Sequence, residues 1–287
     1  MHRWLLLTTL FLPILSAQWI NYTPAGTPRT KDGKVNLSAP VPRLNGKPDL
    51  TGVWEHEQSK PEEYKKLLGA DYDPAKQTTL IGMENEHVHK YGFNVLLDQS
   101  ADVKLTPAGD AAQKKRRAEY NPLNVCHGEY GWPVLGLLSE PIKLIQAPKE
   151  TVILYEIDGM HRQVFTDGRK LPKEFELPAY LGYSVGRWEK DTFVVETAGF
   201  NDRTPIDAMG HPRSEAMKVT ERYTRRDYGH LDTELTFDDP TLYTKPFTIK
   251  ISYNLVPDND IFEMFCGQNE KDRQHMMVGP TTMVTPN

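Results

Sequence analysis

The segment Glu215-Ala-Met-Lys-Val-Thr-Glu-Arg-Tyr223 carries the pattern from which the fold of the chain is predicted. Successive side chains of a β-strand point to opposite faces, so Glu221 is expected on the same face as Met217, Val219 and Tyr223. A carboxylate on an otherwise apolar strand face is typical of a polar spot inside a sheet or barrel. The segment therefore predicts a β-protein with a charged group in its interior.

Alternating segments of this kind recur along the chain and are separated by turn signals, of which Asp158-Gly159 is a specific hairpin signal. They predict about ten strands, nearly all in antiparallel order. Such a meander tends to close, because closure removes exposed edges. We therefore predict an all-β fold, a lipocalin-like barrel of about 8–10 strands with a few short helices in the N-terminal half. An open β-sandwich is the alternative. After a first strand near Gly52, the expected strands are 142–146, 151–157, 160–166, 183–189, 192–198, 219–226, 230–237, 247–255 and 260–266.

The N-terminus has the three parts of a secretory signal peptide. Residues 1–3 are a short basic start, residues 4–15 are an apolar core, and Ser16-Ala17 are small. No other segment approaches the roughly 18 consecutive apolar residues of a membrane helix. We expect a signal peptide at residues 1–17 and a periplasmic or secreted protein without stable membrane insertion.

The rest of the chain is expected to form one barrel domain with attached segments. Residues 18–50 are rich in Pro, Gly and Asn, which indicates an extended arm. The barrel domain is expected at 51–272, with a helical insertion around 57–125 and a flexible tail at 273–287.

Charge and motif content disfavour several classes of protein. The 287 residues have a formal net charge of −5 and a pI near 6.0, which gives no electrostatic reason to expect a nucleic-acid partner. The chain has no Gly-x-Ser-x-Gly elbow, Walker loop, dinucleotide glycine motif or Cys-x-x-Cys pair. We expect a small-molecule ligand and no cofactor.

Cys126 and Cys266 are the two cysteines of the chain. In an oxidising compartment such a pair predicts a disulfide, which would stabilise the fold by up to about 5 kcal/mol. Two buried free thiols are the alternative.

Three side chains near the opening segment are candidate acid–base residues: Glu221, Glu215 and His211. The two glutamates are about 20 Å apart in an extended strand, too far for one small site. His211, in the loop before the strand, could serve acid–base chemistry with Glu215 or hold a divalent metal. The alternative is structural: Glu221 forms a buried salt bridge with an arginine such as Arg162 or Arg187, and His211 caps its loop.

A second set of candidates follows strand ends, where loops gather polar groups around a cavity. Guanidinium groups there would suit a carboxylate or sulfated ligand, because they bind such anions in a bidentate way. The alternative is that they pair with Asp167, Asp202 or Asp207 and hold the loops, and that the aromatic residues are core. The candidate ligand-binding residues are Arg162, Arg169, Tyr183, Trp188, Asn201, Asp202, Arg203 and Tyr223.

The segment Glu86-His-Val-His89 has a spacing that would place two imidazoles on one strand face. The sequence offers no evident third ligand beside them. We therefore predict no metal site.

Several motifs resemble known proteins. Gly52-x-Trp54 is similar to the first-strand signature of lipocalin-type barrels, in which the tryptophan packs under the closed end. Over residues 18–272 the chain resembles a family of uncharacterised secreted proteins that are multi-copy in soil bacteria. That family brings no activity, whereas lipocalin-type barrels imply binding of apolar molecules. The motifs that carry the family resemblance are Phe165-Thr-Asp-Gly-Arg169, residues 183–202, Asp239-Pro-x-x-Tyr-Thr-Lys-Pro246 and Phe265-Cys-Gly-Gln-Asn-Glu270.

Two functions are therefore considered. The first is an extracytoplasmic barrel that binds a small, partly apolar ligand through an interior Glu/Arg polar spot. The alternative is a cofactor-independent lyase, isomerase or hydrolase that uses Glu221 or His211 as a general acid or base. We favour binding, because no complete catalytic set can be assembled at plausible distances.

Overall fold

The protein is represented by a computed structural model that describes residues 23–57, 59–68, 89–119, 131–137, 141–207 and 209–263. The expected signal peptide, the tail, and Cys126 and Cys266 with their expected disulfide lie outside these residues.

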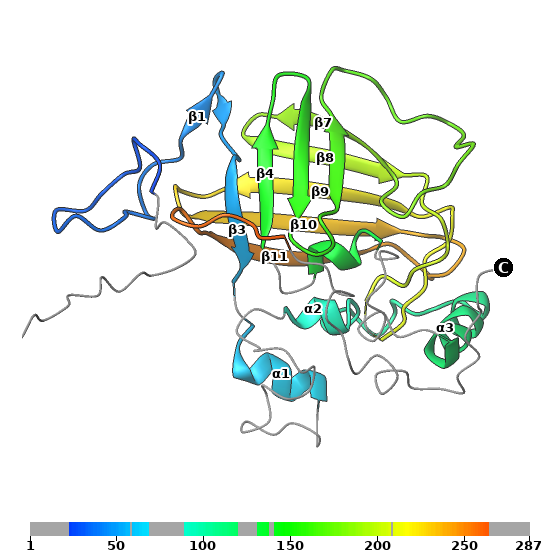
Figure 1. Cartoon of the computed structure of the whole chain (residues 1–287). Helices are drawn as coiled ribbons and strands as arrows, with labels where there is room; N and C mark the ends of the chain where they lie inside the picture. Colours follow the sequence, from blue (N-terminus) through cyan, green and yellow to red (C-terminus); the bar gives the residue numbers. More distant parts are fainter. Residues whose placement is uncertain are drawn as a thin grey trace, which may run out of the picture.

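Nine strands close into a barrel in the order β10-β11-β3-β4-β5-β6-β7-β8-β9 (Figure 1). The predicted all-β barrel is confirmed, and the open sandwich is wrong. The sheet closes because β9 pairs with β10 along its whole length. The strands are β3 (Gly52–His56), β4 (Ile142–Gln146), β5 (Glu150–Tyr155), β6 (His161–Phe165), β7 (Tyr183–Glu189), β8 (Thr192–Ala198), β9 (Lys218–Arg225), β10 (His230–Asp238) and β11 (Phe247–Leu255).

Two details differ from the expected meander. β6 and β7 pair in parallel, with Val164 opposite Ser184. The long connection at 166–182 makes this possible, because parallel neighbours need a crossover where a hairpin turn suffices for antiparallel ones. The last strand expected at 260–266 is also not formed as predicted: residues 260–263 are irregular, and the rest lies outside the described residues.

The segments outside the barrel lie at opposite ends of β3 (Figure 1). At one end, β1 (Arg43–Leu44) and β2 (Lys47–Pro48) form a separate hairpin of the arm. At the other end lie the short helices expected in the N-terminal half, which are α1 (Pro61–Leu68), α2 (Lys90–Phe93) and α3 (Pro107–Glu119). A 3₁₀ turn, η3 (Val134–Leu137), precedes β4. No helix in the described ranges is long and apolar enough to cross a membrane.

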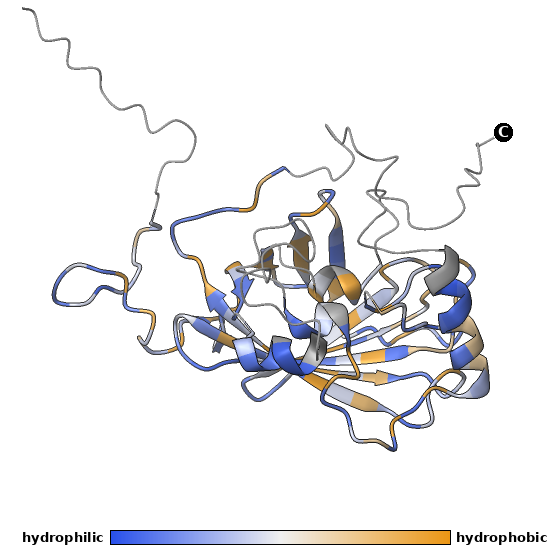
Figure 2. Cartoon of the chain, turned by 90° about the horizontal axis from the view of Figure 1, so that it is seen from below, coloured by the Kyte–Doolittle hydropathy of each residue, from blue (hydrophilic) through white to orange (hydrophobic). Residues whose placement is uncertain are grey.

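Hydrophobic and hydrophilic residues alternate along the strands, as Figure 2 shows by colour. On β9 and its neighbours, Glu221 lies opposite Val195 on one side and Leu235 on the other. All three are buried. The period-two pattern therefore directs one face of each strand into the barrel.

Trp54 anchors the first strand inside the barrel. It is completely buried, and its Nε1 donates to the carbonyl of Leu50 at 3.0 Å. The guanidinium of Arg225 lies 4.9 Å from its ring. Arg225 also donates to the backbone carbonyls of Asp49 and Tyr228, so it connects the arm to the barrel.

Gly186 provides a test of how tightly the interior is packed. A Cβ at this position would lie 2.7 Å from the Phe193 ring and 2.8 Å from Val164. Because overpacking forces neighbours to shift, Gly186→Ala is expected to lower the free energy of unfolding by about 1–3 kcal/mol in urea denaturation. Arg187→Ala, on the exposed face one residue along, is the control and is expected to cost at most about 1 kcal/mol. Equal stability of Gly186→Ala and the parent protein would contradict this packing.

Candidate functional site

An ion pair crosses the barrel interior between strands that are not neighbours. Nη2 of Arg162, on β6, lies 2.6 Å from Oε1 and 2.8 Å from Oε2 of Glu221, on β9. The two side chains are only 2 % and 1 % exposed. The structural alternative considered for Glu221 is thus present, with Arg162 as the partner. Arg187 lies on the outer face and pairs with Glu189 and Glu196.

Three buried tyrosines interact with this pair. The hydroxyl of Tyr223 donates to Oε2 of Glu221 at 2.6 Å. Tyr155 and Tyr253 are also buried, and Arg162 and Glu221 act on them electrostatically. Burial, which penalises a phenolate, raises the pKa of all three hydroxyls above the usual value of 10.0. The tyrosines are therefore neutral at physiological pH.

Arg162 has donors that the described part of the protein does not use. A guanidinium has five N–H donors, and Arg162 presents only Nη2 to Glu221. Its Nε and Nη1 are buried and have no hydrogen-bond partner among the described residues. A buried donor left unsatisfied costs about 1–3 kcal/mol. Arg162 is therefore the interior group with the clearest capacity to bind something more.

Trp132 covers one face of this guanidinium. Its ring lies 4.3 Å from Cζ of Arg162, a cation–π distance, and it is buried. Its segment is held to the barrel because Nε2 of His56 lies 2.9 Å from the carbonyl of Gly136. The backbone N–H of Trp132 donates to the backbone carbonyl of Tyr180 at 3.1 Å. Trp132 thus forms a fixed wall of the site.

Asn201 helps to hold Trp132 in place through Arg213. Its backbone carbonyl and Oδ1 accept from Nε and Nη2 of Arg213 at 2.7 and 2.9 Å. Nη1 of Arg213 in turn donates to the carbonyl of Trp132 at 2.5 Å. Asn201 was predicted to contact ligand, whereas in the structure its side chain accepts from Arg213.

His211 forms a second buried cluster, with Asp207. Nδ1 of His211 lies 2.5 Å from Oδ2 of Asp207, which is fully buried. The backbone N–H groups of His211 and Val95 also donate to this carboxylate, at 3.1 and 2.8 Å. The contact favours the tautomer with a proton on Nδ1, which leaves Nε2 as an acceptor. Glu215, expected on the strand beside His211, is exposed in the turn before β9.

The remaining predicted residues lie apart from the interior pair. Arg169 is exposed and donates to Asp167 through Nε at 2.9 Å and to the hydroxyl of Tyr183 at 2.9 Å. This matches the alternative in which Arg169 holds its loop. Asp202 and Arg203 are exposed. Trp188 is partly buried and packs on Phe193 at 5.1 Å.

The His-x-His segment is described only at His89, since Glu86 and His87 lie outside the described residues. His89 caps α2, because its side chain accepts from the backbone N–H of Tyr91 at 3.4 Å. Within the described ranges, no cluster of His, Cys, Asp or Glu is suited to hold a metal ion.

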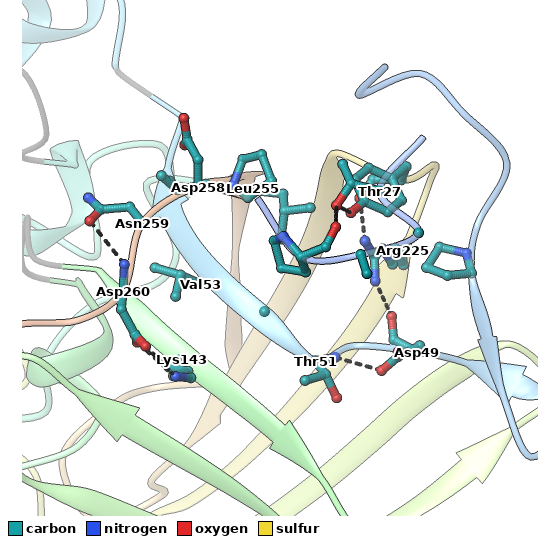
Figure 3. A pocket seen from close by; sticks show the side chains of 18 residues that line it. Thr27, Asp49, Thr51, Val53, Lys143, Arg225, Leu255, Asp258, Asn259 and Asp260 are labelled. Carbon is teal, nitrogen blue, oxygen red and sulfur yellow. Dashed lines mark hydrogen bonds and ion pairs between the residues drawn. The ribbon is translucent and has the colours of Figure 1, made fainter. Parts of the chain in front are cut away.

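A cleft of about 850 Å³ lies outside the barrel, between the arm and the loop after β11 (Figure 3). Its two cationic side chains are already engaged. Arg225 donates to the backbone carbonyl of Asp49, and Lys143 pairs with Asp260 at 2.7 Å.

No family model, curated protein or solved structure matches the chain. Function is therefore inferred from the interior groups themselves.

Removing one partner of the buried pair should be far worse than removing both. Arg162→Met leaves Glu221 buried without its counter-charge and is expected to lower the free energy of unfolding by about 3–5 kcal/mol. The double variant Arg162→Met/Glu221→Leu should recover most of this loss in urea denaturation, because no charge remains uncompensated. A double variant no more stable than Arg162→Met would contradict the pairing.

The pKa of His89 gives a prediction about pH. Burial, with a smaller contribution from His56, holds this pKa well below its usual 6.5. The unfolded chain therefore takes up the proton first, so stability is constant above about pH 6.5 and falls below it, by up to about 1.4 kcal/mol per pH unit.

His89→Asn is the matched variant, because asparagine keeps the capping acceptor but does not titrate in this range. Denaturation from pH 7.5 to 5 should show a steeper loss of stability for the parent protein than for His89→Asn. Parallel curves for the two proteins would show that His89 is not a buried neutral imidazole.

Proposed function

We propose that the protein is an extracytoplasmic barrel that binds a small, partly apolar molecule in its interior. Arg162 donates hydrogen bonds to a polar group of the ligand. The observation that carries the proposal is that Nε and Nη1 of Arg162 are buried without a partner among the described residues. An acceptor atom at these nitrogens would remove an energetic cost that the protein otherwise bears.

The walls around Arg162 suit the apolar part of such a ligand. Trp132 packs on the guanidinium, and the buried Val164 follows Arg162 on the same face of β6. Ligand sites combine mainly apolar walls with a few placed polar groups, which supports this part of the barrel as the binding region. Tyr223 belongs to the same interior through its hydrogen bond to Glu221, and Trp188 packs on Phe193 farther along the barrel.

The compartment and the family resemblance in this proposal rest on the sequence alone. The signal peptide expected at residues 1–17 supports a periplasmic or secreted location, and such a compartment favours the Cys126–Cys266 disulfide. The resemblance to lipocalin-type barrels supports binding over catalysis, whereas the resemblance to the secreted soil-bacterial family brings no activity. As fold-level likeness, the lipocalin resemblance is the weaker support.

The second candidate function is acid–base catalysis by His211. Its support is the contact with Asp207, since a buried carboxylate at Nδ1 fixes the orientation and the tautomer of the imidazole, as in known catalytic dyads. Glu221 is the poorer base, because both of its oxygens accept from Arg162 and one also accepts from Tyr223.

The variant Arg162→Lys separates a ligand donor from a purely structural ion pair. Lysine keeps the positive charge beside Glu221 but lacks the Nε–H and Nη1–H groups. Molecules that co-purify with the secreted protein would be identified by native mass spectrometry, and affinities measured by titration calorimetry. Loss of two hydrogen bonds should weaken binding at least about tenfold.

Arg187→Lys, on the outer face, is the control and should leave the affinity unchanged. Equal affinities of Arg162→Lys and the parent protein would contradict a role for these donors. Failure to detect any bound molecule, with no thermal shift across a panel of small metabolites, would contradict binding altogether.

A further inference from the structure

We propose that the polar group of the ligand is an uncharged hydrogen-bond acceptor, such as a ketone, ester or amide carbonyl, and that the interior excludes carboxylates and sulfates. This inference rests on the proposed function and narrows its ligand class. It also differs from the expectation that arginines of this chain would recognise an anionic ligand.

The first step concerns charge. Arg162 is already neutralised by Glu221, since their charged atoms lie 2.6 Å apart and both side chains are buried. Tyr155 and Tyr223 also act electrostatically on Arg162, and both are neutral. The cluster of Arg162, Glu221, Tyr155 and Tyr223 therefore has no net charge. An anionic ligand would add an uncompensated charge at a buried site, which is strongly unfavourable.

The second step concerns hydrogen bonds. Oε1 of Glu221 accepts from Arg162, and Oε2 accepts from both Arg162 and Tyr223. Both carboxylate oxygens thus have a partner, whereas Nε and Nη1 of Arg162 have none among the described residues. The polar atoms of the pair that lack a partner are therefore donors, and the complementary ligand group is an acceptor.

The third step concerns direction. Cζ of Arg162 lies over the Trp132 ring, 4.3 Å from its centroid. The guanidinium N–H bonds lie in the plane of the group, and those of Nε and Nη1 meet no acceptor among the described residues. A carbonyl oxygen approaching in that plane can accept from Arg162 while the attached carbon skeleton packs against apolar walls.

Matched probes test this proposal on the unmodified protein. Each pair shares one skeleton: methyl octanoate with octanoate, and methyl cinnamate with cinnamate. At pH 7.5 the esters are expected to bind at least tenfold tighter than the carboxylates in titration calorimetry.

A carboxylate that binds as tightly as its ester, or tighter, would overturn this inference and leave the proposed function standing. If neither member of any pair binds, and no co-purified molecule is found, the proposed function itself falls, and this inference falls with it.

Glu221→Gln gives the complementary result. This variant leaves Arg162 without its counter-charge, so the ester-to-carboxylate affinity ratio should shift at least tenfold toward the carboxylate. Glu196→Gln, which removes a carboxylate from the outer face, is the control and should leave the ratio unchanged. An unchanged ratio in folded Glu221→Gln would contradict the charge argument.

A pH series on the parent protein keeps the test independent of variant stability. If only the uncharged acid enters the interior, apparent affinity for octanoate should rise about tenfold for each pH unit between pH 8 and 6, as the protonated fraction rises. An affinity that does not change with pH would show that the carboxylate itself binds, which would overturn the inference.

Discussion

The barrel interior depends on the ion pair between Arg162 and Glu221. These residues belong to β6 and β9, which are separated in the sheet by β7 and β8, so their contact spans the barrel. Removing two charges from water costs several kcal/mol per ion, which a buried pair recovers only with good geometry and further hydrogen bonds. Glu221 obtains them from Tyr223. Arg162 packs on Trp132 but keeps Nε and Nη1 without a hydrogen-bond partner among the described residues, and the proposed ligand site rests on this difference.

Residues from loops outside the strands surround Arg162. Trp132 packs on the guanidinium of Arg162 and stacks with the ring of Phe200, whose centroid is 6.1 Å away. Arg213 connects the Trp132 carbonyl to Asn201 in the loop after β8. Two loops therefore contribute to the surroundings of the ion pair. Trp132 lies in the loop before β4, and Asn201 and Arg213 lie in the loop between β8 and β9. The contacts that hold these loops on the barrel also place Trp132 beside Arg162, so the surroundings of Arg162 depend on the folding of the whole domain.

Strand periodicity allowed the sequence to predict which strand residues point into the barrel, but not which loop residues pack against them. The inward direction of Glu221 and its pairing with an arginine such as Arg162 follow from period-two alternation and from the cost of a lone buried charge. The same rule applied two residues beyond Tyr223 puts Arg225 on the same strand face, and its side chain is buried near the end of the barrel. Trp132 and Asp207 lie in loops, where no periodicity indicates which way a side chain points.

Other differences have local causes. The strand containing Glu221 begins only at Lys218, because Ser214 and its hydrogen bonds to Asp239 and Ala216 form a turn that leaves Glu215 exposed. The parallel pairing of β6 and β7 depends on the long 166–182 connection, which carries no register signal of its own. Hairpins with two-residue turns are easier to predict because the turn itself fixes the register.

The central claim is that Arg162 holds Glu221 through one nitrogen and keeps the others for a ligand. A high-resolution crystal structure of the protein purified from its native secretory route tests this most directly. We predict Nη2 of Arg162 on both oxygens of Glu221, and an acceptor atom of a bound molecule about 2.7–3.2 Å from Nε or Nη1. If Nε and Nη1 instead bond to groups of the protein itself, or if Glu221 pairs elsewhere, the account is contradicted.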